Sequence, residues 1–317
     1  MKNRSPNAPS ASQHNRRAFT LIELMIVIVI ILILIGLLIP AVGAVRLRAQ
    51  QANVRAEITN FEAAITAFRQ QFGMDPPSGI VLHEAANASW DQRSKGLVRK
   101  MWSQYNFGLA CDINGDGDTT DTIALNAGEC LVFFLGGVYE KTSDGYFRVY
   151  GFSKNPARPF LNPGHDPGDP GYVANDGFSA ANTGRLGPFF EFDASRFVDT
   201  DAASAPPGEN APEYLDSFPS QQRPYIYLSS YDGRGYRTAD IAGTGMSSVY
   251  YQGNPSSAPS NNSTPYKSKS YQIISPGADY QFGTGGNYDP NKNFPATPVD
   301  RTMEADNITN FVSGTLK

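Results

Sequence analysis

The chain has 317 residues, of which 40% are hydrophobic and 12% aromatic, so it can bury a sizeable core and is not intrinsically disordered. Its formal net charge is −4, and residues 1–18 hold four Lys or Arg and no acid, which leaves the remainder at −8. This charge argues against a protein that coats nucleic acid, so no nucleic-acid partner is predicted. The 30 Gly and 23 Pro residues favour strands and irregular structure outside the N-terminal region.

A basic leader precedes an apolar run near the N-terminus. The stretch from Leu24 to Val45 has 22 residues without a charge. As a helix it would span roughly the ~30 Å hydrocarbon core of a bilayer. A cleaved secretory signal peptide is one alternative, although its apolar region is usually shorter, at about 7–15 residues. A plain membrane anchor is another. Arginines on both sides favour only slightly an orientation with the leader inside the cell.

An amphipathic stretch follows the apolar run. Its apolar residues recur at intervals of three and four, which places them along one side of a helix. They are Val54, Ile58, Phe61, Ile65, Phe68 and Phe72. Gly73 and the following prolines end the pattern. The sequence therefore predicts one helix over about residues 20–72, with a kink at Pro40.

One carboxylate, Glu23, stands near the start of this apolar helix. An acid within a membrane helix is costly and usually has a partner. If the chain is cut between Ala18 and Phe19, the new α-amino group of a neighbouring copy could pair with Glu23 and fix the axial register between subunits. The alternative is that Glu23 lies at headgroup level and caps the first helical turn. On this residue alone the two interpretations are equal.

The segment "RRAFTLIELMIVIVIILILIGLLIPAV" resembles the N-terminus of type IV pilins and type II secretion pseudopilins. The resemblance implies that a membrane-embedded prepilin peptidase cuts before Phe19 and methylates its amine. It also implies that Phe19 and Glu23 act in assembly, and that Gly36 and Pro40 are helix irregularities. The family usually has Gly before the cut, where this chain has Ala18. We therefore expect slower or unaltered processing.

Three later segments resemble the C-terminal half of the major type II pseudopilin: "RPYIYLSS" from Arg223, "SYQIISPGADYQFGTGG" from Ser270 and "ADNITNF" from Ala305. In that family the last loop holds calcium. Carried over by position, the candidate ligands are Asp279, Asp306 and, more weakly, Asp289. The loop here is longer and carries fewer acids than the family's loop. The alternative is a turn held by Asx hydrogen bonds.

A second acidic loop, "CDINGDGDTTDT", begins at Cys111. Its oxygen-bearing residues at alternate positions, with glycine sixth, follow the pattern of an EF-hand calcium loop. These residues are Asp112, Asn114, Asp116 and Asp118. The twelfth position is Ile123 instead of Glu, so Asp121 would have to substitute. A structural Ca²⁺ site is predicted, and an Asp/Gly-rich surface turn is the alternative.

Cys111 and Cys130 flank this loop, 19 positions apart. In an extracytoplasmic compartment a disulfide between them is predicted, which would contribute about 3 kcal/mol in the chain-entropy model. Two buried thiols are the alternative. The sequence has no zinc-protease, nucleophile-elbow or phosphate-loop motif, so no catalytic residue is predicted and the chain is not expected to be an enzyme.

The predicted fold class is α+β, a long N-terminal helix packed on an antiparallel sheet with long loops. The predicted divisions are a leader (1–18), a helix (19–72, of which 19–45 serves membrane and assembly) and a head (73–317). Within the head we expect an insertion at about 80–220 with its own buried core, followed by a pseudopilin-like sheet at 221–317.

The predicted function is a structural subunit of a type IV pilus-like or type II secretion pseudopilus filament. Its expected partners are other copies and related pilins, the prepilin peptidase and an inner-membrane assembly platform. The subunit would lie in the inner membrane before assembly, with its head outside the cytoplasm. Afterwards it would lie in a periplasmic or cell-surface filament. A surface-displayed adhesin or binding module is the main alternative, and a membrane-tethered enzyme is a further one.

Overall fold

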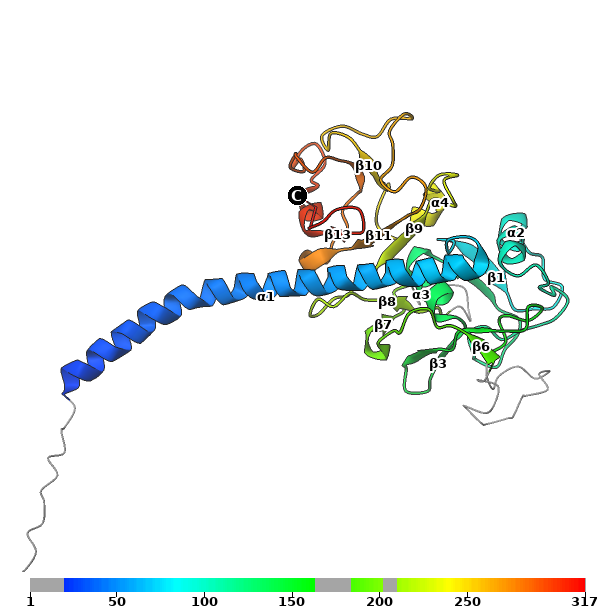
Figure 1. The fold of residues 1–317 in the computed structure, drawn as a ribbon, viewed down its shortest axis with the longest axis horizontal. Coiled ribbons are helices and arrows are strands. Elements are labelled where there is room, and N and C mark those ends of the chain that lie inside the picture. Colours follow the sequence, from blue (N-terminus) through cyan, green and yellow to red (C-terminus); the bar gives the residue numbers. More distant parts are fainter. Residues whose placement is uncertain (1–19, 163–183, 202–209, 317) are drawn as a thin grey trace, which may run out of the picture. The chain divides into compact units, whose positions relative to one another are not determined.

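A computed structural model describes residues 20–162, 184–201 and 210–316. The chain comprises two compact units, residues 1–49 and 50–317. Helix α1 begins in the first unit and ends in the second (Figure 1). The α-helices are α1 (Leu21–Phe72), α2 (Gln92–Met101), α3 (Ala127–Gly136) and α4 (Thr238–Ile241). The 3-10 helices are η2 (Ala194–Arg196), η3 (Gly277–Asp279) and η4 (Thr302–Asp306).

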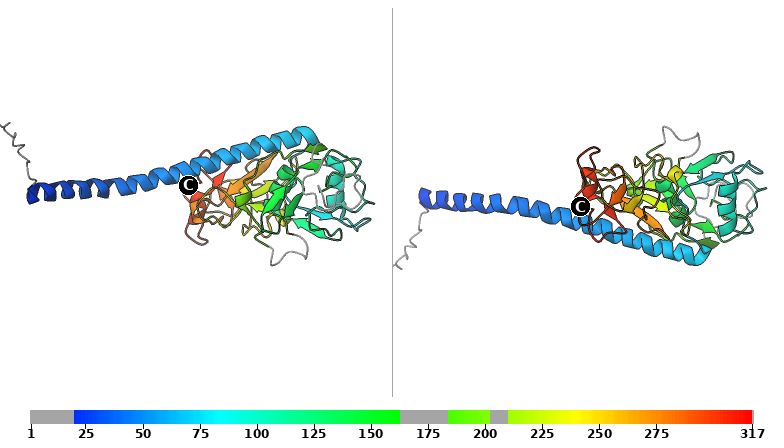
Figure 2. Two further views of the ribbon diagram at one scale, coloured as in Figure 1. Left: turned by 90° about the horizontal axis from the view of Figure 1, so that it is seen from below. Right: turned by 90° about the horizontal axis from the view of Figure 1, so that it is seen from above.

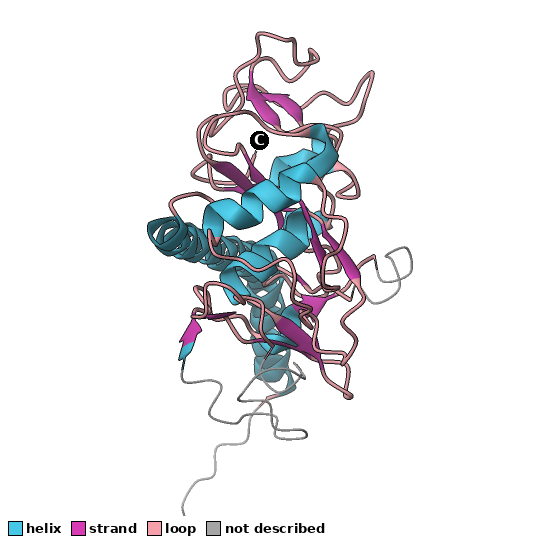
Figure 3. Cartoon of the chain, turned by 90° about the vertical axis from the view of Figure 1, so that its right-hand side faces the viewer, coloured by secondary structure: helices cyan, strands magenta, loops and turns pink. Residues whose placement is uncertain are grey.

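The strands of the head are short and joined by long loops (Figure 3). They are β1 (Ile80–His83), β2 (Thr122–Leu125), β3 (Tyr139–Lys141), β4 (Phe147–Val149), β5 (Phe152–Ser153), β6 (Arg185–Leu186), β7 (Phe197–Val198), β8 (Glu213–Tyr214), β9 (Ile226–Ser229), β10 (Tyr250–Gln252), β11 (Tyr271–Ser275), β12 (Gly286–Tyr288) and β13 (Ile308–Thr309). Antiparallel pairs join β1 to β2, β3 to β4, β5 to β6 and β7 to β8, whereas β10 and β12 pair in parallel. The α+β class is confirmed.

A three-stranded antiparallel sheet in the order β13-β11-β9 lies in the C-terminal part of the head. Its strands come from the three segments that resemble the major pseudopilin. Ile274 of β11 lies opposite Ile226 of β9, and Ser275 lies opposite Ile308 of β13. The turn after β9 begins with two residues in the left-handed region, Tyr231 (φ 52°) and Asp232 (φ 60°), as its "YDGRG" sequence suggests.

The second half of α1 lies along the head in both views of Figure 2. All six residues of the predicted stripe are buried, with at most 9% of each exposed. Phe61 stacks its ring 4.3 Å from that of Phe190, and Phe68 meets Phe134 edge-on at 5.8 Å. The predicted helix and its buried side are therefore confirmed, because a 3.6-residue repeat of apolar side chains forces one face of the helix inward.

Polar contacts also hold the second half of α1 against the head. Glu57 accepts two hydrogen bonds of 2.6 Å from the Arg196 guanidinium and a third of 2.6 Å from the Tyr225 hydroxyl. Arg55 Nη2 donates to the backbone oxygens of Val312 and Gly314 at 2.6 and 2.5 Å. Charge-assisted bonds of this kind hold the helix at one position on the head, whereas apolar burial alone is not directional.

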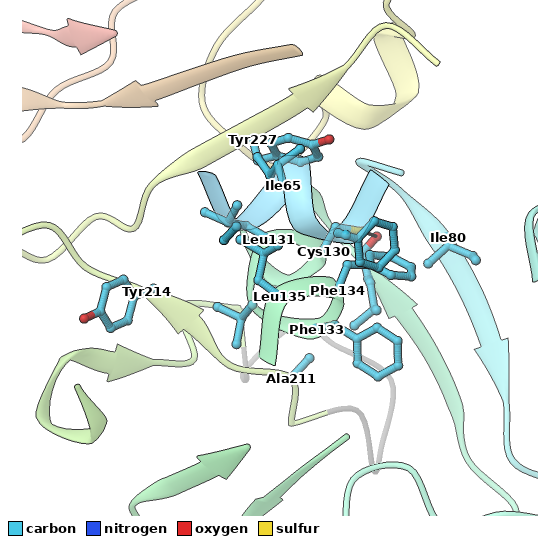
Figure 4. Packing of buried hydrophobic residues seen from close by; sticks show 14 of the residues in the cluster. Ile65, Ile80, Cys130, Leu131, Phe133, Phe134, Leu135, Ala211, Tyr214 and Tyr227 are labelled. Carbon is cyan, nitrogen blue, oxygen red and sulfur yellow. Dashed lines mark hydrogen bonds between the residues drawn. The ribbon is translucent and has the colours of Figure 1, made fainter. Parts of the chain in front are cut away.

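Helix α3 lies at the centre of the head, and every residue in it is buried. Figure 4 shows Leu131 facing Ile65 of α1, with Phe133 and Ala211 on the other side of the helix. One hydrophobic cluster joins α1, α3, β1, β9 and β11. The expectation of a separate core within about 80–220 is therefore wrong. Apart from Glu129 in its first turn, α3 has no charged side chain to turn toward water, so it is covered by the elements before and after it in the chain.

The start of α3 is fixed by a capping box. Asn126 Oδ1 accepts from Gly128 N and Glu129 N at 2.8 and 3.0 Å, and Glu129 Oε2 accepts from Asn126 N at 2.6 Å. These bonds satisfy amide groups that the helix itself cannot bond. The residues that follow the cap, Ala127 to Glu129, are buried, so the cap sets where the chain enters the core.

We expect Asn126→Ala to lower the free energy of unfolding by about 1–2 kcal/mol, the usual cost of losing an N-cap. Urea unfolding of the detergent-solubilised chain, followed by tryptophan fluorescence, would measure it. Asn262→Ala removes the same group from an exposed turn and should change stability by less than about 0.5 kcal/mol. Equal effects of the two substitutions would contradict the role of the cap.

Candidate functional site

The first turn of α1 positions Glu23. Thr20 donates from its backbone nitrogen and its hydroxyl to Glu23 Oε2 at 2.9 and 2.8 Å, and Glu23 N donates to Thr20 Oγ1 at 3.2 Å. This reciprocal cap is the helix-capping arrangement that one of the two interpretations of Glu23 expects, and the pairing of Glu23 with a neighbouring copy stays a prediction. The carboxylate is also exposed and open to a neighbouring copy. The cleavage residues Ala18 and Phe19 lie outside the described residues.

The side chains behind Glu23 form a continuous apolar surface. From Leu21 to Val45 the large apolar side chains are between 45 and 76% exposed. Soluble monomers rarely expose an apolar surface of this extent, so lipid or other proteins must cover it. Within the described residues, α1 is the one helix that is long and apolar enough to cross a membrane. The predicted membrane and assembly segment is therefore consistent with the structure.

Helix α1 continues through Gly36 and Pro40 without interruption. The irregularities that the resemblance predicted at these residues do not end or divide the helix. No heavy atom lies within 4 Å of the place where a side chain at Gly36 would begin. Gly36 therefore leaves a shallow notch on the exposed apolar surface, at which a partner backbone can approach closely.

The acidic loop after Cys111 is held by its own side chains. Asp112 accepts from Gly115 N and Gly117 N at 2.6 and 2.9 Å, and Asn114 accepts from Asp116 N at 3.1 Å. Asp116 and Asp118 repeat this pattern toward the end of the loop, and Asn114 Nδ2 donates to Asp121 at 3.1 Å. Asp112 and Asn114 are buried, whereas Asp116 and Asp118 are exposed. Half of the loop is thus built into the core.

Sequence reasoning missed one acid beside this loop, Glu84. It follows strand β1 directly and is fully buried. Burial is the main cause that raises the pKa of Glu84 to about 9, with the nearby charges of Asp112 and Asp121 contributing to the rise and the hydrogen bond from Ile113 N opposing it. Burial also raises the pKa of Asp121. The only sign of Glu84 in the sequence was its position directly after the short, mostly apolar segment "IVLH".

The second acidic group is only partly assembled. Asp306 Oδ2 accepts from Ala278 N and Asp279 N at 2.6 and 3.0 Å, and burial followed by the charge of Asp279 raises the pKa of Asp306 to about 6. Asp289 instead accepts from Asn291 N at 3.0 Å and lies 3.9 Å from Lys292 Nζ. The ligand set carried over from the pseudopilin is therefore not brought together, and calcium there stays a prediction.

An ion pair organises the glycine-rich loop that would hold that calcium. Glu304 is fully buried and accepts two bonds from Arg301 at 2.8 and 2.7 Å, and it also accepts from Thr284 N and Gly285 N at 3.0 and 3.2 Å. Arg301 Nη1 reaches the carbonyl oxygen of Asn287 at 2.8 Å. The Arg301 guanidinium thus binds carboxylate and carbonyl oxygens that a metal cation would otherwise bind.

No three His, Cys, Asp or Glu side chains in the described part of the chain are arranged to hold a metal ion as they stand. The acidic loop nevertheless offers amide and carbonyl oxygens, which such a set does not include. His83 is occupied elsewhere, with its Nδ1 3.1 Å from the Thr122 hydroxyl. The absence of catalytic residues and of enzyme activity stays a prediction.

The predicted disulfide is wrong, because Cys111 and Cys130 are separate buried thiols in the described structure. Cys111 Sγ lies 3.9 Å from the Tyr105 hydroxyl, and Cys130 Sγ donates to Leu125 O at 3.7 Å. Cys130 faces the core from α3, where burial raises its thiol pKa well above the usual value. Both cysteines act as small apolar residues here.

Comparison with known families identifies the N-terminal segment. Residues 13–39 match the prokaryotic N-terminal methylation motif, and the match does not extend into the head. No curated protein and no solved structure matches the chain. The matched residues include Glu23 and most of the exposed apolar surface. The chain thus carries the N-terminal motif of prepilin-type proteins on an apolar helix, which supports a pilin-like or pseudopilin-like precursor that is processed by a prepilin peptidase.

Proposed function

We propose that the chain is a structural subunit of a type IV pilus-like or type II secretion pseudopilus filament. The observation that carries the proposal is the exposed apolar surface from Leu21 to Val45, with Glu23 at its head, inside the methylation motif. Before assembly, lipid covers this surface in the inner membrane. In the filament, other copies or related pilins cover it, and hydrophobic burial and packing supply most of the energy.

The remaining partners follow from the proposed passage of the subunit from the inner membrane into the filament. An inner-membrane assembly platform would lift the processed subunit out of the bilayer, and the head would then be displayed in the periplasm or at the cell surface. The proposal includes no catalytic step. An adhesin or binding module that uses the same N-terminus for display is the alternative. It has less support, because the large apolar side chains that are most exposed on the described head, Leu109, Tyr146 and Val299, occur singly.

Mass spectrometry of the protein from its native membrane tests the proposal. We expect a mature chain that begins at Phe19 and carries one methyl group on its α-amine, because the motif places the cut there. The same N-terminus should be found in filaments sheared from cells. A chain that keeps residues 1–18 in mature cells would contradict the filament role. A chain cut after Val45 would indicate simple secretion.

A further inference from the structure

Glu84 closes the acidic loop at both ends. Its backbone nitrogen donates to Asp121 O at 3.1 Å, and its backbone oxygen accepts from Cys111 N at 3.0 Å. The two ends of the loop are therefore held on a single residue of a neighbouring segment. Because β1 and β2 pair antiparallel, with His83 opposite Thr122, the next position along β1 falls beside the last loop residue.

The Glu84 carboxylate faces into the loop. Its Oε1 accepts from Ile113 N at 2.6 Å and from Asn114 N at 3.4 Å, which are the second and third positions of the EF-hand pattern. The residue is 0% exposed, and its Oε2 has no hydrogen-bond partner among the described residues. A buried carboxylate oxygen without a donor is costly, so this atom needs either a cation or a proton as its partner.

The loop itself has oxygens suited to a hard cation. Asp112, Asn114 and Asp116 fix their side chains by bonds from backbone amides, and each brings a side-chain oxygen, the type of ligand that Ca²⁺ binds. Gly115 (φ 72°) and Gly117 (φ 88°) give the chain its sharp turns. A side chain at Gly115 would begin 2.7 Å from Glu140 Cβ, so this turn is packed against β3.

The twelfth position of the pattern cannot supply a ligand. Ile123 is fully buried and belongs to β2, where it pairs with Leu82 of β1. In an EF-hand the twelfth residue is a Glu that binds calcium through both oxygens. In this chain the buried acid that bonds to the loop is Glu84, which lies 28 positions before Asp112.

We propose that Glu84 and the loop from Asp112 to Asp121 form a Ca²⁺ site in which Glu84 supplies the acid that the twelfth position lacks. Glu84, Asp112 and Asn114 are held in the core, whereas the exposed Asp116 and Asp118 and the half-buried Asp121 turn inward when the ion binds. Calcium is favoured over Mg²⁺ because it accepts six to eight oxygens in irregular geometry, and over zinc because the ligands are oxygens. The site stands independently of the filament role.

Calorimetric titration of the chelator-washed, detergent-solubilised chain with CaCl₂ tests the site. We expect one saturable site with a Kd of about 10⁻⁴ to 10⁻³ M, the range of extracellular calcium modules, and a melting temperature that rises with calcium and falls again with EGTA. Glu84→Gln should weaken binding at least about 10-fold. Without calcium, this variant should melt no lower than the wild type, because a neutral amide replaces a buried carboxylate.

Two further variants complete the design. Asp116→Asn changes an exposed loop ligand and should also weaken calcium binding about 10-fold or more. This variant tests whether the loop binds calcium even if Glu84→Gln fails to fold. Glu191→Gln makes the same chemical change on an exposed acid outside the loop and should bind like the wild type. Wild-type protein without saturable binding at 10 mM CaCl₂ would overturn the proposal. Wild-type affinity in Glu84→Gln would overturn the role of Glu84.

Discussion

A Glu23→Ala variant is expected to be cut and methylated at Phe19 yet to form no filaments. The carboxylate lies at the head of an apolar surface that assembly would bury. In the proposed filament it would pair with the methylated amine of the next subunit. Removing one member of a buried charge pair costs about 3–5 kcal/mol, which corresponds to a loss of more than about 100-fold in subunit association. Filament yield in sheared fractions, measured against total mature subunit, is the readout.

The structure shows how to separate pairing from capping at this residue. Thr20→Ala removes the hydroxyl that bonds Glu23 but keeps the carboxylate, so filaments should still form. Glu23→Gln keeps an oxygen for the cap but removes the charge, so filaments should be lost. If Glu23→Gln assembles normally while Thr20→Ala does not, Glu23 serves only to cap the helix, and the proposed pairing is wrong.

An Arg196→Ala variant is expected to lower the free energy of unfolding by about 2–4 kcal/mol. The guanidinium forms two bonds to Glu57, donates to Leu215 O and lies 4.4 Å over the Tyr214 ring. Its loss leaves the Glu57 carboxylate with the Tyr225 hydroxyl but without a cation. The estimate lies below that for a fully buried pair because the two side chains are 21% and 13% exposed.

Urea unfolding followed by tryptophan fluorescence would measure this loss in the detergent-solubilised chain. Arg196→Lys keeps the charge but cannot form the bidentate pair with Glu57, so we expect an intermediate loss of about 1–2 kcal/mol in the free energy of unfolding. Arg234→Ala removes an exposed guanidinium and should change stability by less than about 0.5 kcal/mol. A loss in Arg196→Ala no greater than that in Arg234→Ala would show that the pair does not fasten α1 to the head.

Sequence reasoning succeeded where a local pattern determines the structure. Helix α1 was predicted to within about one residue at either end, and its buried stripe was predicted in full, because a 3.6-residue apolar repeat specifies both the helix and its inner face. The sheet formed by β9, β11 and β13 came from the pseudopilin resemblance. The helix and its stripe needed only residues close together in the sequence, whereas the pairing of the three distant strands could be expected only from the resemblance.

The errors concern contacts between distant segments. Helix α3 is apolar on every side, so its composition implied a core but could not say which elements would surround it. The spacing of Cys111 and Cys130 was compatible with a disulfide, yet the fold places Cys130 inside α3 with its thiol toward the Leu125 carbonyl. Glu84 was missed for the same reason, because only the pairing of β1 with β2 brings it to the loop.

Arg301 and Glu304 form a buried ion pair that holds the glycine-rich loop in the C-terminal part of the head. Both partners of this ion pair belong to the chain itself, so no chelator can remove one of them and dilution cannot separate them. The glycine-rich loop that they hold can therefore reach its final conformation as soon as the chain folds, without waiting for a bound ion. A change in the ions around the subunit would leave these contacts in place.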